Sequence, residues 1–235
     1  MPARGSSAER SRQRSSSERR RRFGLLLVAI SAVFAVEGIA DPGPWPEAIA
    51  SVLLAITVIL SLRVADARPG VMRPVVLVTG ILTAVAIIAA VAGHSRGIAV
   101  AGSQLLLVIV APPATMLGTI RTLRLRNQVT IEAVFGVLCL YVLFGMLFAF
   151  LYSVIALADG GAFFAGHEKA TIAHCQYFSF TTLTTVGYGD LTAVSNLGRT
   201  LANSEALVGQ IYLVTVVTLI VGNLGLRRRE PVEER

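Results

Sequence analysis

Long apolar segments constrain the fold of this chain more strongly than any other feature. An α-helix needs about 20 apolar residues to cross a bilayer, because each residue advances it by about 1.5 Å. Within lipid, a helix satisfies its own backbone hydrogen bonds, whereas an open strand or a loop does not. We therefore predict an all-α membrane protein with six transmembrane helices at residues 23–40, 48–65, 75–92, 98–120, 130–158 and 200–226.

The distribution of basic residues indicates how these helices are oriented. Of the 21 Lys and Arg, 18 lie in the two terminal segments, between the second and third spans, or between the fourth and fifth. The other connections contain only Arg96, Lys169 and Arg199. Because basic loops stay on the cytoplasmic side, we predict a multi-pass protein of the cell (plasma) membrane with both termini in the cytoplasm.

The two terminal segments are polar. Residues 1–22 are rich in Arg, Ser and Glu, so we predict a disordered basic cytoplasmic tail that lies close to anionic membrane lipid. No basic folded module follows this tail, and we expect no nucleic acid as a partner. Arg21 and Arg22 before an apolar run also resemble a twin-arginine export signal, so cleavage after Ala40 is the alternative to a retained helix. Residues 227–235 are predicted to form a short cytoplasmic tail.

Prolines mark three of the predicted helices. Pro46 and Pro74 stand just before the second and third spans, where the first turn of a helix tolerates the missing N–H group. Pro112 and Pro113 lie within the fourth span, so we predict a kink or a break there.

The stretch between the fifth and sixth spans is too polar to cross a membrane and too long for a tight turn. Residues 171–183 are partly apolar, and a segment containing Gly187 and Gly189 follows them. This pattern predicts a half-length helix and a sharp return, which together make a re-entrant loop that opens on the outer side.

Residues 185–189 read Thr-Val-Gly-Tyr-Gly, and with the helix before them they resemble the pore helix and selectivity filter of potassium channels. The two glycines permit backbone angles that let successive carbonyls point the same way. Since one strand cannot surround an ion, the resemblance implies four chains around one axis, a homotetramer. It also implies K⁺-binding carbonyls on Thr185, Val186, Gly187 and Tyr188, with Gly189 completing the filter.

Five residues near this filter are expected to support it or to gate the pore. In potassium channels the acid after the filter is braced by the pore helix, and the facing candidates for Asp190 are Tyr177 and Thr181. Glu205, an intramembrane acid early in the sixth span, is predicted to form hydrogen bonds behind the pore helix. Gly209 stands where the inner helix of the family bends to open, and close helix packing is its alternative role.

The resemblance divides the chain into a four-helix membrane domain at 23–126 and a pore domain at 127–226. This order resembles the voltage-gated branch of the family, but residues 98–120 contain no Arg or Lys. Strong voltage dependence needs several charges within the membrane field. The first domain is therefore expected to have the topology of a voltage sensor without its arginines.

These features favour a potassium-selective channel that conducts K⁺ passively and is not strongly voltage-gated. A non-conducting or modulatory subunit that assembles with other channel chains is the alternative. A transporter built on related loops would need four of them in one chain. No nucleophile and base are paired among the spans, so we expect no enzymatic activity, no catalytic residue and no cofactor, with K⁺ as the transported ion.

Overall fold

The computed structural model describes residues 5–41, 43–92, 98–126, 131–160, 162–166 and 169–227. Over these ranges the regular structure is helical, apart from a single antiparallel bridge between Phe164 and Ala193. The all-α prediction is confirmed. The helices are α1 (Gly5–Ile39), α2 (Pro44–Val64), α3 (Pro69–Val91), α4 (Ile98–Arg126), α5 (Ile131–Ala158), α6 (Ile172–Leu183) and α7 (Asn196–Arg227).

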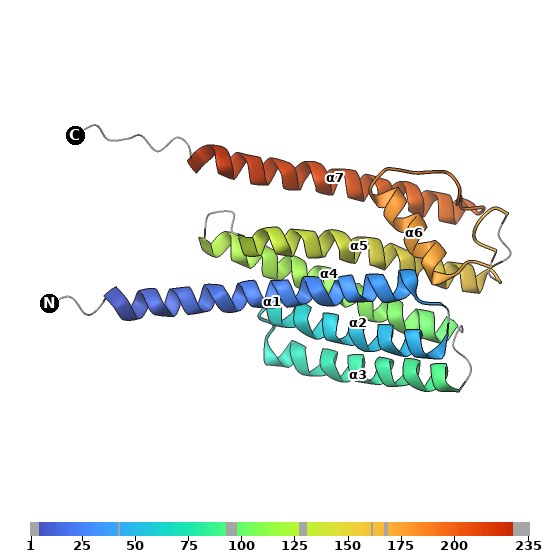
Figure 1. The fold of residues 1–235 in the computed structure, drawn as a ribbon, viewed down its shortest axis with the longest axis horizontal. Helices are drawn as coiled ribbons and strands as arrows, with labels where there is room; N and C mark the ends of the chain where they lie inside the picture. The colour runs from blue at the N-terminus through green and yellow to red at the C-terminus, as the bar shows by residue number, and fades with distance from the viewer. Residues whose placement is uncertain are drawn as a thin grey trace.

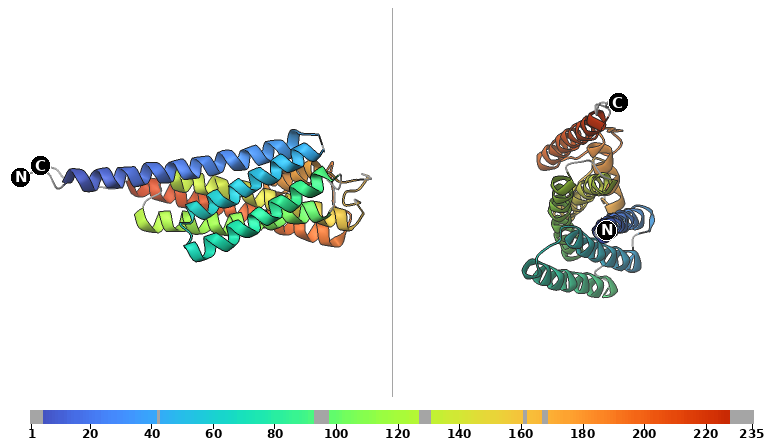
Figure 2. Two further views of the ribbon diagram at one scale, coloured as in Figure 1. Left: turned by 90° about the horizontal axis from the view of Figure 1, so that it is seen from below. Right: turned by 90° about the vertical axis from the view of Figure 1, so that its left-hand side faces the viewer.

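The long helices lie side by side, whereas the short α6 is tilted against them (Figure 1). α2 contacts α1, α3 and α4, and α4 packs along α5, from which residues 127–130 separate it in the sequence. α3 and α7 lie at opposite edges of the molecule (Figure 2). α1 begins and α7 ends at one end of the bundle, and α6 with the loop after it lies at the other.

The helices match the predicted membrane spans closely. Each predicted span falls within one helix, except for one residue at an end of some spans. The sixth predicted span, 200–226, lies within α7, and its membrane crossing stays a prediction. Among the residues that the structure describes, five helical segments are long and apolar enough to cross a membrane, by length and composition: Glu18–Ile39, Pro44–Val64, Pro69–Ala89, Val100–Arg121 and Ile131–Ala158.

Residues 5–22, part of the predicted disordered tail, extend α1 in the structure. Arg, Glu, Gln and Ala are good helix formers. Residues that extend an existing helix also avoid the unfavourable nucleation step. The apolar part of α1 provides that nucleus, so the same composition that suggests a disordered tail also suits a helical extension. Residues 1–4 and 228–235 lie outside the described part of the chain.

The structure places the four prolines only partly as predicted. Pro46 does lie in the first turn of α2. α3, however, begins at Pro69, and Pro74 lies inside the helix. α4 also continues through Pro112 and Pro113 without a break, and α2, α3 and α5 pack against it. Contacts with neighbouring helices can hold a helix together where proline removes an intrahelical hydrogen bond.

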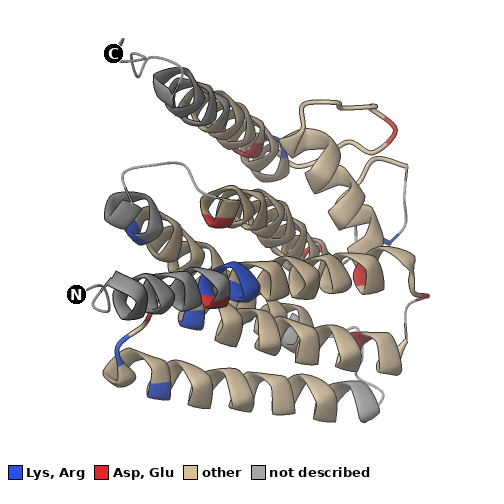
Figure 3. Ribbon diagram, turned by 60° about the vertical axis from the view of Figure 1, so that its left-hand side comes forward, with Lys and Arg blue, Asp and Glu red and all other residues tan. Residues whose placement is uncertain are grey.

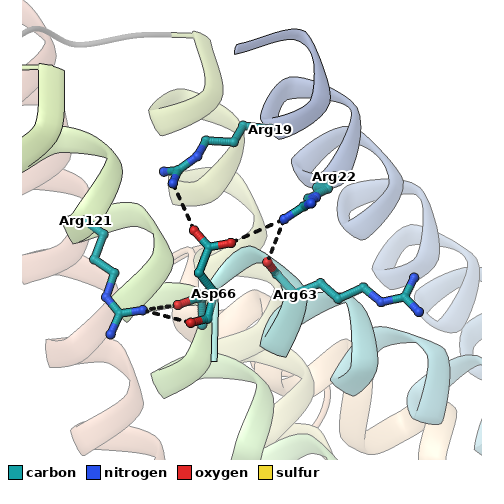
Figure 4. A network of polar contacts seen from close by, with 6 residues as sticks. Arg19, Arg22, Arg63, Asp66 and Arg121 are labelled. Carbon is teal, nitrogen blue, oxygen red and sulfur yellow. Dashed lines mark hydrogen bonds and ion pairs between the residues drawn. The ribbon is translucent and has the colours of Figure 1, made fainter. Parts of the chain in front are cut away.

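A cluster of arginines around Asp66 joins three elements at the basic end of the bundle (Figures 3 and 4). Asp66 lies in the turn between α2 and α3 with a φ of 47°, a left-handed conformation that Asp tolerates better than most residues. Its carboxylate accepts hydrogen bonds from Arg19 at 2.9 Å and Arg22 at 3.3 Å. Arg121 donates to the carbonyls of Ala65 and Asp66. Because the ion pairs are partly exposed, they stabilise the fold little and mainly fix how α1 and α4 meet this turn.

α2 and α4 approach each other closely at Gly118. A Cβ atom at this position would lie 2.7 Å from the carbonyl oxygen and 2.9 Å from the carbonyl carbon of Val64. Both atoms belong to the backbone of α2, which cannot rotate away as a side chain can. By contrast, a Cβ on Gly80 of α3 would have no heavy atom within 4 Å among the residues that the structure describes.

We expect Gly118→Ala to lower the free energy of unfolding by about 1–3 kcal/mol, because α2 and α4 must move apart. This loss outweighs the gain of up to about 1 kcal/mol in helix propensity. Thermal unfolding of the purified protein in detergent measures the effect. Gly80→Ala is the matched control and should unfold at the wild-type temperature or above it. Equal unfolding temperatures for the two variants would contradict the close approach.

Candidate functional site

The short helix α6 begins with a side-chain cap and is too short to cross a membrane. The Thr171 hydroxyl accepts a hydrogen bond from the His174 N–H at 3.2 Å, and the Thr171 N–H donates to His174 Nδ1 at 3.5 Å. This reciprocal pair is a capping box that starts the helix at Ile172. Its 12 residues extend for about 18 Å, so the predicted half-length helix is present.

The segment after α6 alternates between two backbone conformations. Thr185, Gly187 and Gly189 have positive φ angles of 59°, 53° and 81°, whereas Val186 and Tyr188 do not. Alternation of left-handed and right-handed residues turns successive N–H groups to one side of the strand, and the carbonyls therefore turn to the other side. Two glycines make this alternation easy, and Thr185 adopts it although it has a branched side chain.

All four carbonyls in the last turn of α6 have hydrogen-bond partners, and the following segment supplies most of them. These are the groups that a helix leaves without intrahelical partners. The Phe180 carbonyl accepts a hydrogen bond from the Thr184 N–H at 3.1 Å, and the Thr182 carbonyl accepts one from the Thr185 N–H at 2.9 Å. The Thr181 carbonyl accepts two, from the N–H groups of Val186 at 2.9 Å and Gly187 at 3.1 Å. The Leu183 carbonyl accepts a hydrogen bond from the Tyr141 hydroxyl at 3.2 Å.

These hydrogen bonds determine where the carbonyls of Thr185 and Val186 point. In a trans peptide the C=O and the N–H of one plane point in opposite directions. The N–H groups of Val186 and Gly187 point to the Thr181 carbonyl. The carbonyls of Thr185 and Val186, which share those peptide planes, therefore point away from α6.

Tyr177 lies beside the outer part of this segment. Its ring stacks on Tyr188 with centroids 6.2 Å apart and an interplanar angle of 8°, and its role as a brace for Asp190 stays a prediction. The Thr181 hydroxyl donates to the Phe178 carbonyl at 3.0 Å, and Thr181 contacts the filter through its backbone carbonyl.

Glu205 connects three helices behind α6. It lies on α7 and is fully buried. Its carboxylate accepts a hydrogen bond from Tyr152 of α5 at 2.7 Å and another from Ser179 of α6. Ser179 also lies 2.7 Å from the Gly145 carbonyl of α5. The predicted contact of Glu205 behind the pore helix is thus present, and it fixes α6 against both α5 and α7.

Gly209 lies directly against the end of α6. A Cβ atom at this position would overlap the Leu183 carbonyl oxygen and would lie 3.1 Å from the Leu183 carbonyl carbon. Tyr141 donates to the same carbonyl. The close-packing role of Gly209 is therefore present in the geometry, and its role as a hinge stays a prediction.

Several residues of this site could not be identified from the sequence. The positive φ of Thr185 has no signal in the residue type, because threonine rarely adopts it. Tyr141, Tyr152 and Ser179 lie in apolar stretches without a distinctive spacing. The presence of Glu205 within an apolar span indicated that a polar partner exists, but did not indicate which residue it is.

Comparisons with known proteins agree with this geometry. Residues 136–224 match the family described as ion channel, and this range includes α6, the filter segment and most of α5 and α7. Protein LctB of Geobacillus stearothermophilus is 42% identical over 57 residues, a match that covers 24% of this chain and 42% of that protein. The match thus spans less than half the length of this curated relative. No solved structure matches the chain. The family match supports an ion channel.

A double-mutant cycle tests the buried contact of Glu205 with Tyr152. Glu205→Leu leaves the Tyr152 hydroxyl buried without its acceptor, a loss of about 1–3 kcal/mol. We expect the substitution to destabilise the wild-type protein more than the Tyr152→Phe variant, by about that amount. Thermal unfolding in detergent measures both. Equal losses in the two backgrounds would show that the hydrogen bond contributes nothing.

Gly209→Ala separates the packing role from the hinge role. Because the added methyl group meets backbone atoms, we expect the variant to unfold at a lower temperature than the wild type. Gly102→Ala is the matched control, because a Cβ on Gly102 of α4 would meet no described heavy atom within 4 Å. An unchanged unfolding temperature for Gly209→Ala, together with altered channel opening, would instead assign Gly209 to the hinge alone.

Proposed function

We propose that this chain is a potassium-selective ion channel that conducts K⁺ passively through residues 185–189. The observation that carries the proposal is the backbone of this segment. Its positive φ angles alternate, and the N–H groups of Val186 and Gly187 are bound by α6. The uncharged carbonyl oxygens of Thr185 and Val186 thereby point away from α6.

A row of such oxygens suits the chemistry of K⁺. The ion must lose most of its water and be coordinated again at almost no net cost, and neutral carbonyl oxygens do this without trapping it. The carbonyls of Thr185, Val186, Gly187 and Tyr188 would form successive sites, and the Thr185 hydroxyl would add an oxygen at the innermost one. K⁺ is here the transported ion, and the mechanism needs no cofactor and no catalytic residue.

The proposal includes a homotetramer. One strand offers oxygens from one side only, whereas an ion in a filter is surrounded. In the single chain Val186 and Tyr188 have 53% and 71% of their surface exposed, which is unusual for an apolar and an aromatic side chain so close to a buried helix. Neighbouring copies around a fourfold axis would cover them.

We further propose that voltage does not strongly gate this channel. Residues 98–120 of α4 contain no Arg or Lys. Arg121, the first basic residue after them, donates to carbonyls of the turn between α2 and α3, which holds it at the end of the bundle. Charges must move through the membrane field to sense voltage. The proposed setting is the plasma membrane, with both termini in the cytoplasm.

Purified protein in liposomes tests the function. Under a K⁺ gradient, the reversal potential should follow the K⁺ equilibrium potential, and equal passage of Na⁺ would refute selectivity. If this chain alone passes no current, the non-conducting subunit is the better assignment.

Gly187→Ala tests the filter backbone. The added Cβ disfavours a φ of 53°, so we expect selective K⁺ flux to be lost. Gly166→Ala is the matched control: its φ of 76° carries a similar penalty, but the residue lies outside the filter. Retained flux in Gly187→Ala, or equal loss in the control, would contradict the role of the left-handed backbone.

A further inference from the structure

The pore helix α6 is supported from outside the region that matches the ion-channel family. α1 contacts α6 directly, although α1 ends almost a hundred residues before the matched region begins. The Gln176 side-chain amide of α6 donates to the Phe34 carbonyl of α1 at 2.9 Å. One turn further along α1, Gly38 leaves room for the same amide, because a Cβ there would lie 3.5 Å from Gln176 Nε2 and Oε1.

A second contact lies one turn along α6. The ring of Phe180 meets the ring of Phe34 edge to face, with centroids 4.9 Å apart. On its other side, Phe180 lies so close to α5 that a Cβ on Gly145 would be 2.5 Å from the ring. Phe180 is thus enclosed between α1 and α5, and α1 completes the packing of the pore helix.

The same turn of α1 is also fixed by a buried polar cluster. Glu37 is only 6% exposed, and its carboxylate accepts a hydrogen bond from Gln104 of α4 at 3.3 Å. Gln104 also lies 3.4 Å from the Ser51 hydroxyl of α2. Residues 34–38 therefore contact α4 through Glu37 and α6 through Phe34, so they provide a rigid support and not a loose contact.

The amide of Gln176 is not explained by stability. The side chain is 3% exposed, and its Oε1 is buried without a hydrogen-bond partner among the residues that the structure describes. A buried unpaired acceptor costs about 1–3 kcal/mol. Methionine has a similar shape and would fill the space without that cost. Positions where a chain departs from the stable choice are often functional.

Gln176 is well placed to act on the filter. The ring of the next residue, Tyr177, stacks on Tyr188. Two adjacent residues of α6 thus connect α1 to the outer part of the filter. A small rotation of α6 at Gln176 would move the Tyr177 ring by a similar angle, because both side chains extend from one rigid helical turn.

We propose that Gln176 is a positioning residue for the filter, and that selectivity for K⁺ over Na⁺ depends on its hydrogen bond to α1. The inference rests on the proposed function as a potassium-selective channel. It assigns to α1 a role in ion selectivity, in addition to its role in the four-helix domain.

Two variants test this dependence from opposite sides of the contact. Gln176→Met removes the donor and keeps the volume, and Gly38→Leu displaces the amide without altering the pore domain. In liposomes with K⁺ on one side and Na⁺ on the other, the reversal potential gives the ratio of K⁺ to Na⁺ permeability. We expect both variants to lower this ratio about fivefold, the factor that corresponds to one ordinary hydrogen bond.

The permeability ratio is a property of each open channel and does not depend on how many channels fold. Thermal unfolding of Gln176→Met should occur at the wild-type temperature or above it, since the unpaired acceptor is gone. Gly80→Leu is the matched control, because a Cβ on Gly80 meets no described atom within 4 Å, and it should keep the wild-type ratio.

The outcomes separate this inference from the proposed function. If the wild-type reversal potential ignores K⁺, the proposed function itself fails. If the wild type is selective and either Gln176→Met or Gly38→Leu keeps its ratio, the role of Gln176 is refuted. It is also refuted if Gly80→Leu lowers the ratio as much, because selectivity would then respond to any disturbance of the four-helix domain.

Discussion

The geometry of the candidate site depends on the pairing between the end of α6 and the segment that follows it. A helix that ends inside a protein must find donors for its last carbonyls. Here the N–H groups of residues 184–187 supply donors for three of these carbonyls, and Tyr141 supplies the fourth. The same hydrogen bonds use the N–H groups of the segment, and the carbonyl groups of Thr185 and Val186 therefore point away from α6. Helix termination and the direction of these carbonyl groups are thus two results of one set of contacts.

Close contacts with other helices keep α6 where this pairing is possible. Gly209 lets α7 approach the carbonyl of Leu183, and Glu205 holds Ser179 from behind. α1 adds the contact at Gln176. None of these contacts is a large apolar interface, and each fixes the position of α6 through a short polar or steric constraint. These constraints add to the apolar packing of Phe178 of α6 against the rings of Tyr152, Phe163 and Phe164.

The sequence was informative where one physical requirement dominates. A membrane span needs a long apolar run, and a half-length helix needs a short one. The positions of the six long helices and of the short α6 could therefore be predicted closely. The N-terminal part of α1 could not, because its composition suits both a disordered tail and a helical extension. The positive φ of Thr185 and the contact of α1 with α6 were also out of reach, since both depend on tertiary packing. Glu205 was predicted to form hydrogen bonds behind α6, and it accepts one from Ser179 there. Tyr177 and Thr181 were predicted as candidates to brace Asp190, and that role stays a prediction.

The short separation of α4 from α5 limits how subunits can be combined. The two helices pack along each other within one chain, and residues 127–130 can span only about 14 Å at full extension. Exchange of the first four helices between neighbours, as in domain-swapped oligomers, is therefore sterically disfavoured. In the proposed tetramer each pore segment would keep the helices of its own polypeptide beside it. In a mixed tetramer of wild-type and variant chains, a substitution in the first four helices would then act on the pore segment of its own subunit and not on that of a neighbouring subunit.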